Sequence, residues 1–258
     1  MENSYEKRMH QIEDWLKEIG SGVKEKLNTL FWVEEKSGKD DLVSEVDKWC
    51  EKEIVERIKQ NYPNDHILGE EGSGDVVQAR NGNVWMIDPI DGTTNFIKLK
   101  ENFGIMVAYF EDGVGKVACI YQPVEDIMLC GAKDCGVKRN QVQLNSVKDI
   151  KLSQGLIDIS RKLIVSSDEW YKDIVNEAIA LRMFGCSAQS IRYVCEGKIA
   201  GYINRLCPWD YAPALVFGKE LGFDVTNING EPLNLQEREL CIIAPPNVYK
   251  KIMEKKKI

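Results

Sequence analysis

Histidine is nearly absent from this sequence: only His10 and His66 occur among its 258 residues. A Ser-His-Asp triad would need one of them, and no Gly-x-Ser-x-Gly turn is present to carry the serine. If the protein is a hydrolase, metal-bound water is therefore a better nucleophile candidate than a histidine-activated side chain.

Several other features are missing as well. The eight cysteines include no Cys-x-x-Cys pair, which argues against a zinc ribbon and favours reduced structural thiols. The net charge is −7, so no basic excess suggests a nucleic-acid partner. There is no secretory signal, and no apolar run approaches the roughly 18 residues that span a bilayer. We therefore expect a cytoplasmic protein that binds neither nucleic acid nor membrane.

Hydrophobic periodicity indicates a mixed α/β class. Apolar residues at helical spacing predict a long helix from Tyr5 to Leu30 and a second helix ending near Asn61. The middle is β-rich, with strands expected at 84–87, 103–110, 116–121 and 126–130. Alternating elements follow: strands at 163–166, 201–203 and 240–244, and helices at 169–180, 188–196, 211–221 and 247–256. Asp210 is expected to cap the helix at 211–221, with Pro213 in its first turn.

A polar stretch at 131–152 suggests a boundary between two parts of one compact unit. The first part, residues 1–140, would hold the N-terminal helices, the antiparallel sheet and most candidate metal ligands. The second part, residues 141–258, would be an α/β part that carries Asp210.

The most informative run is Val-Trp-Met-Ile-Asp-Pro-Ile-Asp-Gly-Thr-Thr-Asn-Phe at 84–96. A predicted strand delivers Asp88 and Asp91 to a tight turn, and Thr93 and Thr94 follow with hydroxyls and backbone N–H groups. Two carboxylates three residues apart can share divalent cations, and the amides after Gly92 can face a phosphate. The run therefore indicates metal-dependent phosphate chemistry.

Four further acids are candidates: Asp47, Glu70, Glu71 and Asp210. Taken singly, each has a structural explanation, since Asp210 can cap a helix and the others can be solvated surface acids. Together with the central run they resemble the inositol monophosphatase family of Mg²⁺-dependent, lithium-sensitive sugar phosphatases. The resemblance rests on three segments in the same order, and it covers the whole chain: Gly69-Glu70-Glu71, Asp88-Pro-Ile-Asp-Gly-Thr-Thr94 and Pro208-Trp-Asp210.

The resemblance implies a fold, an assembly and a cofactor. The fold would be a layered α-β-α-β-α sandwich of the sugar phosphatase type, and the assembly a homodimer. The cofactor would be two to three Mg²⁺ ions, with Mn²⁺ possible and Li⁺ and Ca²⁺ inhibitory. The first Mg²⁺ would be held by Glu70, Asp88 and the carbonyl of Ile90. The second would be held by Asp88, Asp91 and Asp210, and a third would be held by Glu70 together with water molecules.

The resemblance also assigns catalytic roles. Asp47 and Thr93 would orient and deprotonate the attacking water, with Glu70 as a further catalytic residue. The backbone amides of Gly92 and Thr93 would bind phosphate oxygens, and Lys36 would lie at the site mouth.

The sequence departs from the family in the expected substrate region. Inositol-specific members carry a glutamate where this chain has Asn204 or Arg205, and Ser187 adds a hydroxyl on the substrate face. Lys98 and Lys100 follow the central run, as in relatives that hydrolyse 3′-phosphoadenosine 5′-phosphate. With Arg205 they could contact a second anionic group, although solvated surface cations are the simpler interpretation.

The sequence therefore predicts a metal-dependent phosphomonoesterase for a small phosphorylated metabolite, foremost inositol monophosphate or a related sugar phosphate. NADP, 3′-phosphoadenosine 5′-phosphate and fructose 1,6-bisphosphate are alternative substrates. A non-catalytic metal- or phosphate-binding regulator is the alternative from another class.

Overall fold

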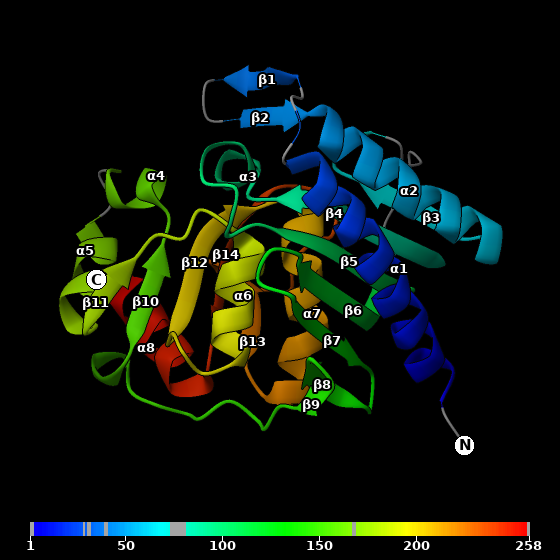
Figure 1. Cartoon of the computed structure of the whole chain (residues 1–258). Helices are drawn as coiled ribbons and strands as arrows, with labels where there is room; N and C mark the ends of the chain where they lie inside the picture. Colours follow the sequence, from blue (N-terminus) through cyan, green and yellow to red (C-terminus); the bar gives the residue numbers. More distant parts are fainter. Residues whose placement is uncertain are drawn as a thin grey trace.

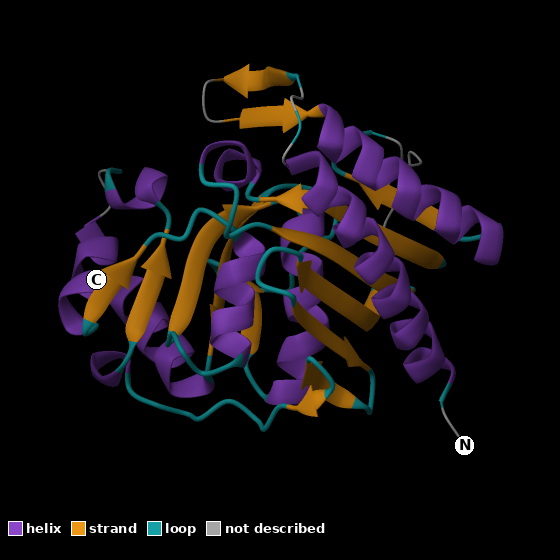
Figure 2. Cartoon of the chain, in the orientation of Figure 1, coloured by secondary structure: helices purple, strands orange, loops and turns teal. Residues whose placement is uncertain are grey.

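The computed structural model describes residues 3–27, 29, 32–38, 41–72, 81–166 and 169–256, with only the backbone for 36–38, 41, 42 and 169. The elements stack as five layers: two helices, a seven-stranded sheet, two helices, a five-stranded sheet and a last helical layer (Figure 1). Figure 2 shows the same alternation of helices and strands. The predicted α-β-α-β-α sandwich is confirmed.

The first layer consists of α1 (Ser4–Leu27) and α2 (Glu45–Asn61). The apolar stripe of α1 is buried against the first sheet, as helical spacing predicted: Met9, Ile12, Leu16, Ile19 and Val23. Helix α1 ends at Leu27, and Leu30 lies outside the described residues. A hairpin of β1 (Val33–Gly38) and β2 (Asp41–Ser44) precedes α2 and lies above α3 (Thr93–Lys98) in Figure 1.

The seven-stranded sheet keeps its strands in chain order. Only the pair of β3 and β4 is parallel. The register of β4 against β5 shifts between Asp88 and Asp91, where the strand leaves the sheet and turns into α3. Both acids stay paired with β5, Asp88 opposite Met106 and Asp91 opposite Gly104, on the two sides of this irregularity. The strands are β3 (His66–Gly69), β4 (Asn83–Asp91), β5 (Gly104–Glu111), β6 (Val114–Gln122), β7 (Ile127–Ala132), β8 (Gly136–Arg139) and β9 (Val142–Gln143).

The second sheet has the order β11-β10-β12-β14-β13. Helices α6 (Ser187–Cys195) and α7 (Pro208–Leu221) lie between the two sheets, and their apolar side chains share one core with both. The outer face is covered by α5 (Glu169–Glu177) and α8 (Pro246–Lys256). The strands are β10 (Leu156–Ile159), β11 (Ala180–Arg182), β12 (Gly201–Leu206), β13 (Asp224–Asn227) and β14 (Glu239–Ala244), and a 3₁₀ turn spans Leu152–Gln154.

Three local predictions are wrong. Residues 163–166 are not a strand, because β10 already occupies that place in the sheet and the chain then turns into the short helix α4 (Arg161–Ile164). Asp210 is not the N-cap of α7. That helix starts at Pro208, where a proline is well tolerated, so Cys207 is the cap and Pro213 lies past the first turn.

Within the described residues, no helix has the length and apolar character needed to cross a bilayer.

Candidate active site

Three carboxylates converge where the two sheets meet α7. Asp88 and Asp91 come from the end of β4, and Asp210 comes from the first turn of α7. One oxygen of each lies within 4.8 Å of the other two. Residues more than a hundred positions apart are thus gathered into one acidic cluster.

Burial dominates the electrostatics of this cluster. It raises the pKa of Asp88 well above the usual range, and the neighbouring charge of Glu70 raises it further. Burial and the charge of Asp91 raise the pKa of Asp210 to about 7. Asp88 Oδ1 is buried without a hydrogen-bond partner among the described residues. A divalent cation would satisfy this oxygen and offset the repulsion, and an all-carboxylate donor set suits a hard ion such as Mg²⁺.

The Asp91 carboxylate is held by the start of α6. Its Oδ2 accepts the backbone N–H of Ala188 at 2.6 Å and the thiol of Cys186 at 2.9 Å. The partial positive charge at this helix end stabilises the carboxylate. Cys186 was not predicted to touch the cluster, because nothing local in the sequence links it to Asp91.

Glu70 follows β3 and borders the cluster, with its charge acting on Asp88. Beneath this turn lies Glu51 of α2, which is fully buried and accepts the backbone N–H of Glu71 at 2.8 Å. A Cβ on Gly69 would lie 2.6 Å from Glu51 Oε2, so a side chain here would have to displace this buried carboxylate or the turn above it. The sequence did not reveal Glu51, which looks like any acid on a helix.

Asp47 and Thr93 form the predicted pair. The Thr93 hydroxyl lies 3.2 Å from Asp47 Oδ1 and 3.0 Å from the carbonyl oxygen of Ile90. Asp47 is fully buried, and its Oδ2 accepts the backbone N–H and the hydroxyl of Ser44. Burial raises the pKa of Asp47 to about 6 despite these bonds. The acid is therefore not the exposed helix residue that its position alone suggested.

Gly92 links the cluster to α3 with a left-handed backbone, at φ 84° and ψ 38°. A Cβ there would lie 3.0 Å from Cys186 Cβ, so both the conformation and the space favour glycine. The amides that follow open α3, where N–H groups have no partner within the helix. They border the same cleft as the carboxylates.

A cleft of about 780 Å³ opens over the cluster. Ser187, Asn204 and Arg205 line it, as predicted, whereas Lys98 and Lys100 do not. The side chain of Lys36 lies outside the described residues. Three further cations in the lining were not predicted, because they come from segments far from the motifs: Arg161, Lys162 and Arg238.

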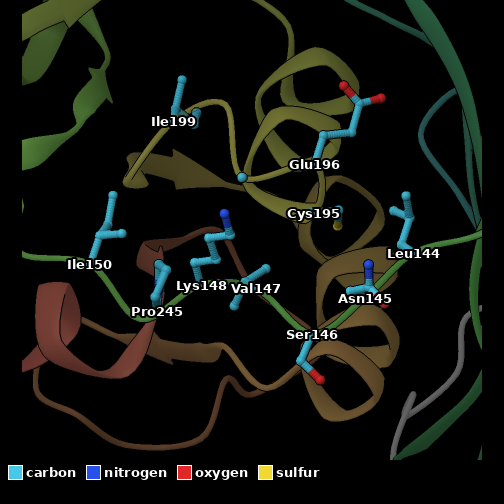
Figure 3. Close-up of a pocket in the computed structure, with 11 residues that line it drawn as sticks. Leu144, Asn145, Ser146, Val147, Lys148, Ile150, Cys195, Glu196, Ile199 and Pro245 are labelled. Atoms are coloured by element: carbon cyan, nitrogen blue, oxygen red, sulfur yellow. The ribbon is translucent and has the colours of Figure 1, made fainter.

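A second cavity of about 320 Å³ lies at the other end of α6 (Figure 3). Its lining includes Cys195, Glu196 and the loop from Leu144 to Lys148. None of the residues predicted for the site lines it. The large cleft is therefore the candidate active site.

Comparison with known proteins agrees with this geometry. Residues 5–257 match the inositol monophosphatase family. The inositol-1-monophosphatase of Bacillus subtilis is 34% identical over 245 residues, which cover 93% of this chain and 92% of that protein. A structure of SaIMPase-II bound with 2′-AMP is 30% identical, covers 95% of this chain and 92% of that chain, and has a TM-score of 0.87. An IMPase/NADP phosphatase complexed with Mg²⁺ and phosphate shares the fold at 23% identity and a TM-score of 0.92, covering 98% and 96% of the two chains. The chain belongs to the inositol monophosphatase family, whose members among these relatives are phosphatases.

Proposed function

We propose that this protein is a Mg²⁺-dependent phosphomonoesterase that acts on a small phosphorylated metabolite, with inositol monophosphate and related sugar phosphates as the first substrates to test. The observation that carries this proposal is the cluster of Asp88, Asp91 and Asp210, with its unpartnered oxygen on Asp88. Such a cluster is costly without a cation and well suited to hold one.

The residues would divide the work as follows. Glu70, Asp88 and the Ile90 carbonyl would hold a first Mg²⁺, Asp88, Asp91 and Asp210 a second, and Glu70 a third. Bound Mg²⁺ supplies Lewis-acid activation of water and charge stabilisation for the phosphoryl group and its leaving oxygen. The carboxylates would fix the positions of the Mg²⁺ ions and so set where the substrate phosphate binds.

Thr93 and Asp47 would orient the attacking water and take up its proton. Because the Thr93 hydroxyl can donate to Asp47, its lone pairs are left to accept from a water in the cleft. The amides of Gly92 and Thr93 would hold phosphate oxygens, which carry negative charge throughout the reaction.

Three considerations bear on the finer assignments. Relatives include an inositol-1-monophosphatase, a fructose-1,6-bisphosphatase/inositol-1-monophosphatase and an IMPase/NADP phosphatase, and SaIMPase-II has been solved with 2′-AMP bound, so nucleotides and fructose 1,6-bisphosphate are alternative substrates. A cytoplasmic homodimer is part of the proposal, on the family resemblance. A non-catalytic regulator is disfavoured because it has no use for the Asp47–Thr93 pair.

A phosphate-release assay tests the function. We expect hydrolysis of inositol 1-phosphate or another substrate named above with Mg²⁺, partial activity with Mn²⁺, loss in EDTA, and inhibition by Li⁺ and Ca²⁺. Thermal denaturation run alongside separates the alternatives. Stabilisation by Mg²⁺ without release from any of these substrates would favour the regulator, and no response to Mg²⁺ would contradict both.

A further inference from the structure

Helix α2 directs a row of buried polar side chains toward the acidic turns of the site. Asp47, Cys50 and Glu51 are three and four residues apart, so they share one face of the helix, and each is 0% exposed. Burying a carboxylate is costly unless hydrogen-bond donors compensate it. Asp47 has its partner in Thr93, and the other two side chains contact the segments that carry the proposed ligands of the first Mg²⁺.

Glu51 accepts a backbone N–H at the point where β3 ends. Strand β3 pairs with β4 as far as Gly69, and the N–H of Glu70 still donates to the carbonyl of Ile87 at 3.2 Å. The next N–H, that of Glu71, lies beyond this pairing and donates to Glu51 Oε2 at 2.8 Å. A carboxylate accepts such a bond more strongly than a neutral carbonyl does. The Glu51 side chain thus fixes the backbone directly after Glu70.

The turn is packed tightly against this carboxylate. A Cβ on Gly69 would lie 2.6 Å from Glu51 Oε2 and 2.8 Å from its carboxyl carbon, so the backbone of the turn lies directly on the side chain. A shift of Glu51 would therefore move the turn and Glu70 with it. Glu70 lines the cleft and Glu51 does not, so Glu51 acts from behind the turn.

The neighbouring Cys50 contacts the other segment of the proposed first Mg²⁺ site. Its thiol donates to the carbonyl oxygen of Pro89 at 3.2 Å, and Pro89 precedes Ile90, whose carbonyl is a proposed ligand. Cys50 and Glu51 thereby hold the two segments from adjacent positions of one helix. The proposed second site depends on another element, because the Asp91 carboxylate accepts from the start of α6.

We infer that Glu51 is a positioning residue for the first Mg²⁺ site, and that it acts through Glu70 by the reach of its side chain rather than by its charge. The inference rests on the proposed function and deepens it. Glu51 has no contact with the ion or the substrate in this assignment. A change at Glu51 should therefore weaken Mg²⁺ binding and leave kcat at saturating Mg²⁺ close to the wild-type value, since Glu70 is in place whenever the ion is bound.

Two substitutions separate reach from charge. Glu51→Gln keeps an acceptor oxygen at the same distance and removes the charge, whereas Glu51→Asp keeps the charge and shortens the side chain by one methylene. We expect Glu51→Asp to raise the calorimetric Kd for Mg²⁺ about tenfold, the value of one hydrogen bond to a charged group, and Glu51→Gln to raise it at most about threefold. Glu56→Asp, at an exposed acid on the same helix, is the matched control and should leave Kd unchanged.

A double-mutant cycle tests whether Glu51 acts through Glu70. In Glu70→Ala protein the positioned ligand is gone, so adding Glu51→Asp should change the remaining Mg²⁺ binding by less than about twofold. In Asp210→Asn protein, which loses a ligand of the second site, Glu51→Asp should still weaken binding about tenfold. Tm in EDTA monitors folding. If Glu51→Asp does not fold, Gly69→Ala displaces the same contact from its other side and takes its place in the cycle.

The outcomes separate this inference from the proposed function. An unchanged Kd in Glu51→Asp, with or without a lower Tm, would overturn the positioning role and leave the phosphatase assignment standing. A large loss in Glu51→Gln with normal binding in Glu51→Asp would show that charge decides, and equal weakening with and without Glu70 would show that Glu51 acts elsewhere; either result overturns the inference. Wild-type protein that neither binds Mg²⁺ nor releases phosphate would overturn the proposed function and the inference with it.

Discussion

Replacing Asp210 with asparagine should abolish activity and yet stabilise the Mg²⁺-free protein. The carboxyl pKa of Asp210 is raised from 3.8 to about 7, which costs its ionised form about 4 kcal/mol at high pH. Asp210 lines an open cleft, so solvent screening reduces the usable figure to about 2 kcal/mol. The amide oxygen of asparagine can still accept the Cys207 N–H, which keeps the start of α7 intact.

We expect Tm of the variant in EDTA at pH 8 to rise by about 4–8 °C over the wild type. Mg²⁺ should raise Tm of the variant less than Tm of the wild type, because the variant keeps the proposed first site but loses a ligand of the second, and phosphate release should fall by orders of magnitude. Asp173→Asn, an exposed acid on α5, is the control and should change neither quantity. A variant with lower Tm in EDTA, an intact Mg²⁺ response and near-normal turnover would refute the charge-cluster reasoning.

Three further predictions concern the surroundings of the cluster. Asp47→Asn should lower kcat about 10²–10⁴-fold, while Mg²⁺ should still raise the Tm of the variant. Thr93→Ser should keep more activity than Thr93→Val, because only serine retains the hydroxyl. Equal losses of activity in the two threonine variants would contradict the role of this hydroxyl. Gly69→Ala should weaken Mg²⁺ binding measured by calorimetry, because its Cβ would lie 2.6 Å from Glu51 Oε2 and displace the turn that carries the proposed ligand. Asp158 is 2% exposed, and burial raises its pKa to about 6, so the stability it contributes is present below about pH 4 and lost as pH rises through 6. Asp158→Asn should therefore have the same Tm as the wild type near pH 4 and a higher Tm at pH 8. The gain in unfolding free energy at pH 8 should be at most about 3 kcal/mol. A difference between variant and wild type that does not change with pH would show that Asp158 is not the titrating group.

The sequence revealed those parts of the site that are local. The four residues Asp88, Asp91, Gly92 and Thr93 lie within six positions of the sequence. The strand-to-helix turn that joins them can therefore be predicted from the types of neighbouring residues. Asp210 was recognised through the Pro208-Trp-Asp210 segment of the family resemblance, although α7 starts two residues before Asp210 rather than after it. The layered fold followed from the order of predicted elements together with the family resemblance.

The parts that depend on long-range packing could not be predicted. Glu51 is buried under Gly69 because α2 packs on β4 beside the turn that follows β3, and helix periodicity does not mark it as special. Arg161 reaches the cleft because the chain turns into α4 after β10, where a short apolar run had suggested a strand. The hairpin of β1 and β2 was missed since its residues are mostly polar and do not alternate clearly.

The first turn of α6 connects the carboxylate cluster to the lining of the cleft. Ala188 donates to the Asp91 carboxylate through its backbone, and the neighbouring Ser187 lines the cleft. Backbone donation is independent of side-chain identity, so Ser187 can vary without loss of the metal ligand. The cleft residues Ser187, Asn204 and Arg205, proposed as substrate contacts, can therefore vary while the carboxylate cluster stays the same. A shift of α6 itself would move the hydrogen bond to Asp91 and the cleft residue Ser187 together, so we expect it to impair turnover of every substrate rather than exchange one for another.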